Sequence, residues 1–132
     1  MADSNKTIQR FLDRMGERLG LPLALQQGVC ALYDNDDNQV AVIEFPEHSE
    51  NIVLHCRLGS VQKRADNFQR LLDLNFDVSA LRGCWLALDQ GEVRLCTQRE
   101  LEYLNEDHFC HWVTGFIAQV RETRTSLGRL LA

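Results

Sequence analysis

The sequence predicts an α+β fold in the order α-β-β-β-α-β-β-α, built on a twisted antiparallel sheet. Amphipathic helical patterns open and close the chain, and the first three short apolar segments between them have connections too short for parallel crossovers. With 132 residues, 45% of them hydrophobic, the chain is long enough for one hydrophobic core but not for two. We therefore predict a single domain over residues 1–132.

The first helix is predicted between Ser4, a favourable N-cap, and Gly20, which ends it together with Pro22. Helical spacing places five apolar side chains on one face: Ile8, Phe11, Leu12, Met15 and Leu19. Three strands follow, over 29–33, 40–45 and 52–58, and the Asn- and Asp-rich segment between the first two predicts a turn. Their short connections predict an antiparallel meander.

A second helix is predicted to begin at Gly59-Ser60. Its apolar stripe consists of Val61, Ala65, Phe68 and Leu72. Leu71 and Leu74 form an additional apolar flank, which predicts a second contact, either with another subunit or with a terminal helix of the same chain.

The remainder of the chain is predicted to contain an irregular link, a hairpin and a long helix. The link covers 75–83, and the hairpin strands 84–88 and 93–97 are joined by a turn containing Gly91. Asn105 is the predicted N-cap of the last helix. The apolar stripe of that helix is the clearest in the chain: Phe109, Trp112, Val113, Phe116, Ile117 and Val120. After Arg121 the chain either extends this helix or frays.

Charge and composition exclude several classes of function. The net charge is −5, which argues against nonspecific binding to nucleic acid or to an anionic membrane. No apolar stretch is long enough to span a bilayer, and the first residues show no secretory signal, so we expect a cytoplasmic protein. The five cysteines include no C-x-x-C pair and are expected to be reduced.

The charges are unevenly distributed. Residues 34–51 contain six acidic residues and no Lys or Arg, whereas residues 56–70 contain four basic residues and one acidic residue. Two interpretations remain open: these are ordinary solvated surfaces, or they form a polar rim around a peptide-binding face.

The sequence contains no recognisable catalytic or cofactor motif. Neither a P-loop nor a G-x-G-x-x-G turn occurs. His108 and His111 are too few for a zinc site. His55 and Cys56, as strand neighbours, should point to opposite faces, which argues against a nucleophile–base pair. We therefore predict no catalytic residues, no metal and no cofactor, and a protein that is not an enzyme.

The ordered set of segments resembles the class I chaperones of bacterial type III secretion, the CesT/Tir-chaperone family. The resemblance runs from about Ile8 to Val120. The segments that carry it are 19–23 (LGLPL), 25–32 (LQQGVCAL), 42–46 (VIEFP), 71–76 (LLDLNF), 85–89 (WLALD) with 93–95 (VRL), and 101–116.

The resemblance implies a chaperone of the bacterial cytoplasm, associated with virulence and protein transport. It implies a homodimer that binds the amino-terminal segment of one or more secreted effector proteins in extended form, partly by adding a strand to a sheet edge, and keeps it soluble and secretion-competent. The secretion ATPase is a further candidate partner, and neither nucleic acid nor membrane insertion is expected. The alternative is a regulatory adaptor of the same fold that binds or sequesters another protein.

The resemblance also directs the assignment of binding residues. We assign effector contact to the first helix and first two strands, with ordinary core packing as the alternative for each residue: Ile8, Phe11, Leu12, Met15, Leu32, Val40 and Val42. We assign dimer contact to Phe68, Leu71 and Leu74 of the second helix. From these assignments, Phe11→Asp is expected to weaken effector binding with little loss of thermal stability, and Leu71→Asp to disrupt the dimer.

Overall fold

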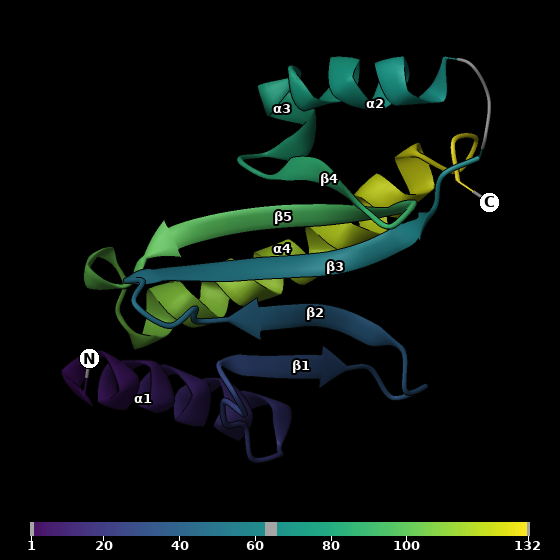
Figure 1. Ribbon diagram of the computed structural model, residues 1–132. Coiled ribbons are helices and arrows are strands. Elements are labelled where there is room, and N and C mark those ends of the chain that lie inside the picture. Colours follow the sequence, from purple (N-terminus) through teal and green to yellow (C-terminus); the bar gives the residue numbers. More distant parts are fainter. Residues whose placement is uncertain (1, 63–65, 132) are drawn as a thin grey trace.

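The computed structural model describes residues 2–62 and 66–131, and within these the predicted order of elements is confirmed (Figure 1). The strands are β1 (Val29–Tyr33), β2 (Gln39–Glu44), β3 (Asn51–Ser60), β4 (Trp85–Asp89) and β5 (Glu92–Glu100). The helices are α1 (Ala2–Leu19), α2 (Asn67–Asn75), α3 (Val78–Leu81) and α4 (Glu106–Ser126), with a 3-10 turn, η1 (Leu101–Tyr103), before α4.

The five strands form one antiparallel sheet in the order β1-β2-β3-β5-β4. The predicted meander of β1, β2 and β3 is confirmed, as is the β4–β5 hairpin. The long strands β3 and β5 pair from Asn51↔Glu100 to Ser60↔Glu92 at the centre of the sheet. Strands β1 and β4 are therefore the two edges.

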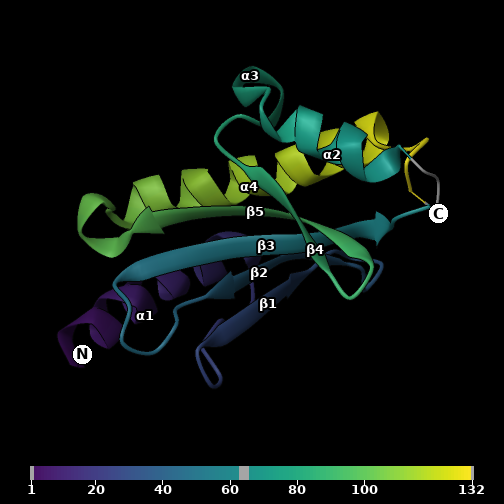
Figure 2. The ribbon, with the colours of Figure 1, turned by 45° about the horizontal axis from the view of Figure 1, so that its top comes forward.

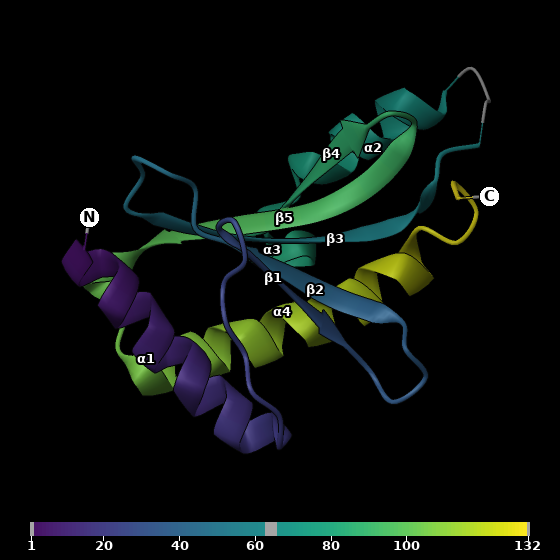
Figure 3. The same cartoon turned by 60° about the horizontal axis from the view of Figure 1, so that its bottom comes forward.

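The long helices α1 and α4 cover one face of the sheet and cross each other there (Figure 3). Strand β3 shows which face this is, because Ile52, Leu54 and Cys56 are buried whereas Arg57 is exposed on the opposite face. The short helices α2 and α3 lie beside β4, at the other end of the sheet from α1 (Figure 2).

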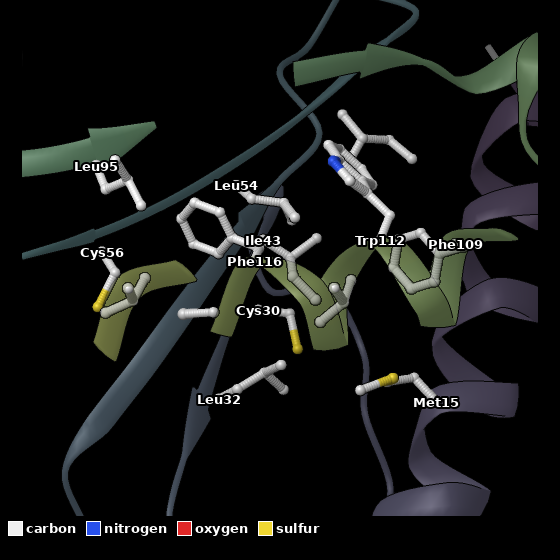
Figure 4. Close-up of a cluster of buried hydrophobic side chains, with 14 of the residues drawn as sticks. Met15, Cys30, Leu32, Ile43, Leu54, Cys56, Leu95, Phe109, Trp112 and Phe116 are labelled. Atoms are coloured by element: carbon white, nitrogen blue, oxygen red, sulfur yellow. The ribbon is translucent and has the colours of Figure 1, made fainter. Parts of the chain in front are cut away.

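The core lies between the sheet and α4. Figure 4 shows Phe109, Trp112 and Phe116 of α4 directed toward the buried strand residues. The Phe11 ring of α1 packs against Phe109 with centroids 5.4 Å apart, which joins α1 to the same core. The predicted stripe of the last helix is thus confirmed as core packing, with Ile117 only partly buried at its margin.

The predicted start of the second helix is wrong. Strand β3 continues to Ser60, because its ladder with β5 continues that far, and Val61 forms an isolated bridge with Leu131. Gly59 permits this path, since a Cβ there would lie 3.3 Å from the Leu131 side chain. Helix α2 begins only at Asn67, and Ala65 of the predicted stripe lies outside the described residues.

Of three further segments, only the link between α2 and β4 differs from expectation. The predicted irregular link contains α3, which Asp77 caps by accepting a hydrogen bond from the Ala80 N–H at 3.2 Å. Asn105 caps α4 as predicted, accepting from the His108 N–H at 2.8 Å. The segment after Arg121 extends the helix, to Ser126.

Candidate protein-binding surfaces

The free edge of β1 is the first candidate surface. The Gly28 C=O accepts a hydrogen bond from the Phe45 N–H across the β1–β2 ladder. The backbone N–H and C=O of every second residue from Gly28 onward therefore point toward β2. The intervening residues turn their backbone groups outward. The outward N–H and C=O of Val29 are hydrogen-bonded to Gln26, at 3.1 and 2.8 Å. Among the described residues, no strand lies on the outward side of Ala31. The edge therefore offers the N–H and C=O of Ala31 to an added strand.

A groove of about 690 Å³ adjoins this edge. It lies where α1 faces the start of β1 and the end of β2, and its lining includes Gln9, Val29 and Phe45. Glu44 and Glu47 contribute negative charge to it. A segment added along β1 could place side chains in this groove.

The second candidate surface is an exposed apolar patch around α2, which we call the α2 apolar face. Leu72 is 68% exposed and Phe76 is 90% exposed. The face consists of Phe68, Leu72 and Phe76, which follow one another at four-residue spacing, and of Leu88 on β4. A pocket of about 170 Å³ lies between α2 and β4 at its centre. Exposed apolar groups gathered in this way are typical of a protein–protein contact.

The predicted dimer residues occupy three different environments. Phe68 lies on the α2 apolar face and Leu74 is partly buried. Leu71 is 5% exposed and belongs to the core of its own chain. Leu72, a member of the predicted apolar stripe of this helix, is exposed. The phase was wrong because it was set from Val61, which does not belong to the helix.

Six of the seven residues assigned to effector contact are buried within the chain: Ile8, Phe11, Leu12, Met15, Leu32 and Val42. Val40 is partly buried. The alternative of ordinary core packing therefore describes the buried residues other than Val42, which lies outside the core cluster and pairs with His55. The expectation that Phe11 is dispensable for stability is wrong. Effector contact by any of the seven stays a prediction. The outward backbone of Ala31 was missed, because side-chain patterns carry no information on which strand is the edge.

The open face of the sheet carries a polar network centred on His55. Its Nε2 lies 2.8 Å from Glu44 Oε1, and Arg94 Nη1 lies 3.3 Å from its Nδ1. Because the guanidinium can only donate, Nδ1 accepts and Nε2–H donates to Glu44. Cys56 points to the opposite, buried face, so the argument against a His55–Cys56 pair is confirmed.

The thiols are free and their surroundings favour the neutral form. Burial raises the pKa of Cys30, Cys56, Cys84 and Cys110, and raises that of Cys96 to about 11. Within residues 2–62 and 66–131, no three His, Cys, Asp or Glu side chains gather as metal ligands do. No helix in those ranges has the length and apolar character needed to cross a bilayer.

Comparison with known proteins adds the following. Residues 10–124 match the model of the Tir chaperone protein (CesT) family. Comparison with curated protein sequences found no match. Among solved structures, the fold is similar to one in the crystal structure of the ExsC–ExsE complex, with 20% identity, 96% of this chain and 95% of that chain covered, and a TM-score of 0.75.

Two other structures share the fold. One comes from the heterodimeric ExoU–SpcU complex of the type III secretion system of Pseudomonas aeruginosa, with 22% identity, 94% and 97% of the chains covered, and a TM-score of 0.65. The other is YbjN of E. coli, described as a putative transcription regulator, with 17% identity, 96% and 94% covered, and a TM-score of 0.59. At these identities the likeness is one of fold.

Proposed function

The chain belongs to the Tir chaperone protein (CesT) family, and we propose that it is a type III secretion chaperone that binds the amino-terminal segment of an effector protein. Family membership over residues 10–124 is the observation that carries the proposal. The ExsC–ExsE and ExoU–SpcU complexes support it, since chains of this fold occur there with protein partners. Family membership also favours a binding protein over an enzyme.

The β1 edge is the surface on which we place the effector segment. Main-chain hydrogen bonds to Ala31 supply affinity without demanding a particular sequence, and side-chain pockets beside the strand supply selectivity. An extended segment cannot bury its own apolar side chains, so the chaperone covers them and prevents aggregation.

We place the dimer contact on the α2 apolar face. The exposed Leu72 and Phe76 would bury apolar area there, and each fully buried side chain of this size contributes about 1.5–3 kcal/mol. This surface lies at the β4 end of the sheet, away from β1. Two copies joined in this way keep both β1 edges free for one effector segment.

We further place this function in the bacterial cytoplasm, carried out by one domain over residues 1–132. Delivery of the effector to the secretion ATPase would be the following step. The binding of the effector segment depends neither on the domain limits nor on the ATPase contact. Disproof of either one would therefore leave the effector-binding proposal standing.

The test is capture of partners with the tagged chain from its native bacterium, followed by limited proteolysis. An effector whose amino-terminal segment alone is protected supports the proposal. A partner protected as a folded domain, with no effect of the chain on export, would favour the regulatory adaptor instead. An unprotected partner contradicts both.

A proline variant tests the β1 edge. Ala31→Pro removes the outward N–H of Ala31 but no hydrogen bond to β2, so the fold should survive. Effector binding should weaken at least about tenfold, as expected for loss of a main-chain pair and of close strand approach. Ala31→Ser, which keeps the N–H, is the matched control and should bind normally. Equal binding by both variants would remove β1 from the effector site.

A further inference from the structure

A groove between α4 and the end of β5 shares no lining residue with either surface described above. Its volume is about 370 Å³. We call it the α4 groove, and its lining includes Arg82, Gln98, Arg99, His111 and Gln119. It forms because β4 pairs with β5 only as far as Trp85↔Cys96, whereas β5 continues to Glu100.

The groove borders a short free stretch of β5. The backbone N–H and C=O of Leu86 on β4 point away from β5, because they are hydrogen-bonded to Asn75. Backbone directions alternate along an antiparallel strand, so those of its neighbour Trp85 point toward β5 and bond to Cys96. Two residues further along β5, Gln98 turns its N–H and C=O toward the same side, beyond the start of β4. Among the described residues, no backbone group from outside the sheet forms a hydrogen bond with the Gln98 N–H or C=O on this side. A short extended segment could therefore pair at this position.

The lining of the groove is positively charged, although the chain as a whole carries −5. Arg82 and Arg99 supply this charge, and no Asp or Glu lines the groove among the described residues. Arg82 has an acidic neighbour outside the lining, Glu122, at 3.7 Å. The charge of the groove thus complements an anionic group.

The guanidinium of Arg99 packs against the aromatic ring of Trp112. Its guanidinium carbon lies 5.3 Å from the centroid of the Trp112 ring. Across residues 2–62 and 66–131, no salt bridge and no side-chain hydrogen bond involves it. A guanidinium placed in this way keeps its donors for a carboxylate, which it binds in bidentate fashion.

Gln119 contributes an unused acceptor. Its side chain is 5% exposed, and Nε2 donates to Ala80 O at 3.1 Å and to Thr123 Oγ1 at 2.9 Å. Oε1 is buried and has no partner among the described residues. Buried amide oxygens are nearly always hydrogen-bonded, so an N–H donor brought to this site would relieve a cost.

We propose that the α4 groove is a docking site for an acidic, extended peptide segment of a partner protein, separate from the β1 edge. Such a segment supplies carboxylates for Arg99, Arg82 and His111 and main-chain groups for Gln98. It also supplies an N–H donor that Gln119 Oε1 can accept once the side-chain amide turns toward the groove. An inorganic anion would satisfy the cationic side chains but not the strand edge. The site does not depend on the effector proposal.

The probe is a short, fluorescently labelled peptide that alternates Glu and Thr, with a Gln-Thr peptide as its uncharged match. Anisotropy should show binding of the Glu-Thr peptide that is at least about tenfold tighter than that of the Gln-Thr peptide and that weakens with added salt. Amide resonances of Gln98, Arg99 and Gln119 should shift. Equal binding of the two peptides, or no binding, would overturn the proposal.

Variants locate the site. Arg99→Gln and His111→Gln, both at exposed positions, should each reduce binding severalfold without unfolding the chain. Arg10→Gln removes the same charge from exposed α1 and should have no effect. Ala31→Pro should also have no effect, which separates this site from the effector site. Two results would contradict peptide docking here. One is full displacement of the Glu-Thr peptide by inorganic phosphate with no shift of the Gln98 amide resonance. The other is unchanged peptide binding by the Arg99→Gln variant.

Discussion

The side chain of Asn75 is hydrogen-bonded to both backbone polar groups of Leu86. Its Oδ1 accepts from the Leu86 N–H at 2.6 Å, and its Nδ2 donates to the Leu86 C=O at 3.1 Å. The amide thereby imitates a neighbouring strand and occupies the outward edge of β4 at this residue. The corresponding N–H and C=O of Ala31 on β1 have no partner in the part of the chain that the structure describes. The sheet thus has one edge that is partly closed and one that is open to strand addition.

Replacing Asn75 by Leu should destabilise the chain. The change leaves the N–H and C=O of Leu86 without partners, at a cost of about 1–3 kcal/mol for a buried group. Urea unfolding followed by tryptophan fluorescence measures the change. Asp73→Ala, at an exposed position of the same helix, is the control and should be nearly neutral. An unfolding free energy equal to that of the original chain would show that these bonds contribute nothing.

Leu72→Asp should convert the proposed dimer into a folded monomer. The side chain is 68% exposed in the single chain, so a charge there affects association and not the core. Sedimentation velocity measures the mass, and circular dichroism checks the fold. Gln69→Asp adds the same charge at another exposed position of α2 and should leave the dimer intact. A dimeric Leu72→Asp protein would exclude the α2 apolar face.

Leu71→Asp should unfold the single chain and not merely disrupt the dimer, as the sequence had suggested. Leu71 is buried in its own core, so a carboxylate there would have to be desolvated without a partner, and the chain should unfold. A stably folded monomeric Leu71→Asp protein would show instead that Leu71 faces the partner. Thermal unfolding distinguishes the two outcomes.

Phe11→Ala should lower the free energy of unfolding by about 3–5 kcal/mol. The ring is 1% exposed and contacts Phe109 in the core, so its loss leaves a cavity. Leu19→Ala, at a position 44% exposed on the same helix, should cost far less. Similar small losses in both variants would mean that α1 is loosely packed.

Stability should fall as the pH rises from about 9 to about 11, partly through Cys96. Burial raises the pKa of this thiol from 9.0 to about 11 in the folded chain. In that range the unfolded state releases the proton and the folded state retains it, so raising the pH favours unfolding. Urea unfolding across this range should show a shallower decline for Cys96→Val than for the original chain. Equal slopes would show that Cys96 does not contribute.

The sequence predicted the order of elements well because each signal was local. The turn at 34–38, the Asn105 cap and the stripe of α4 depend on residues close together in the chain, and all three are present. The start of α2 was placed wrongly because it depends on a distant ladder between β3 and β5. Local apolar spacing could not reveal that pairing.

By itself, the sequence determined the fold class, the family and the absence of a recognisable catalytic motif, since these follow from local patterns and ordered segments. Only the tertiary structure decided which apolar residues are core and which are surface. Leu71 and Leu72 are adjacent in the chain, yet one is buried and the other exposed, because helix phase is set by packing against β4. The same holds for Ala31 and Gln98, whose backbone groups are available only because of strand order.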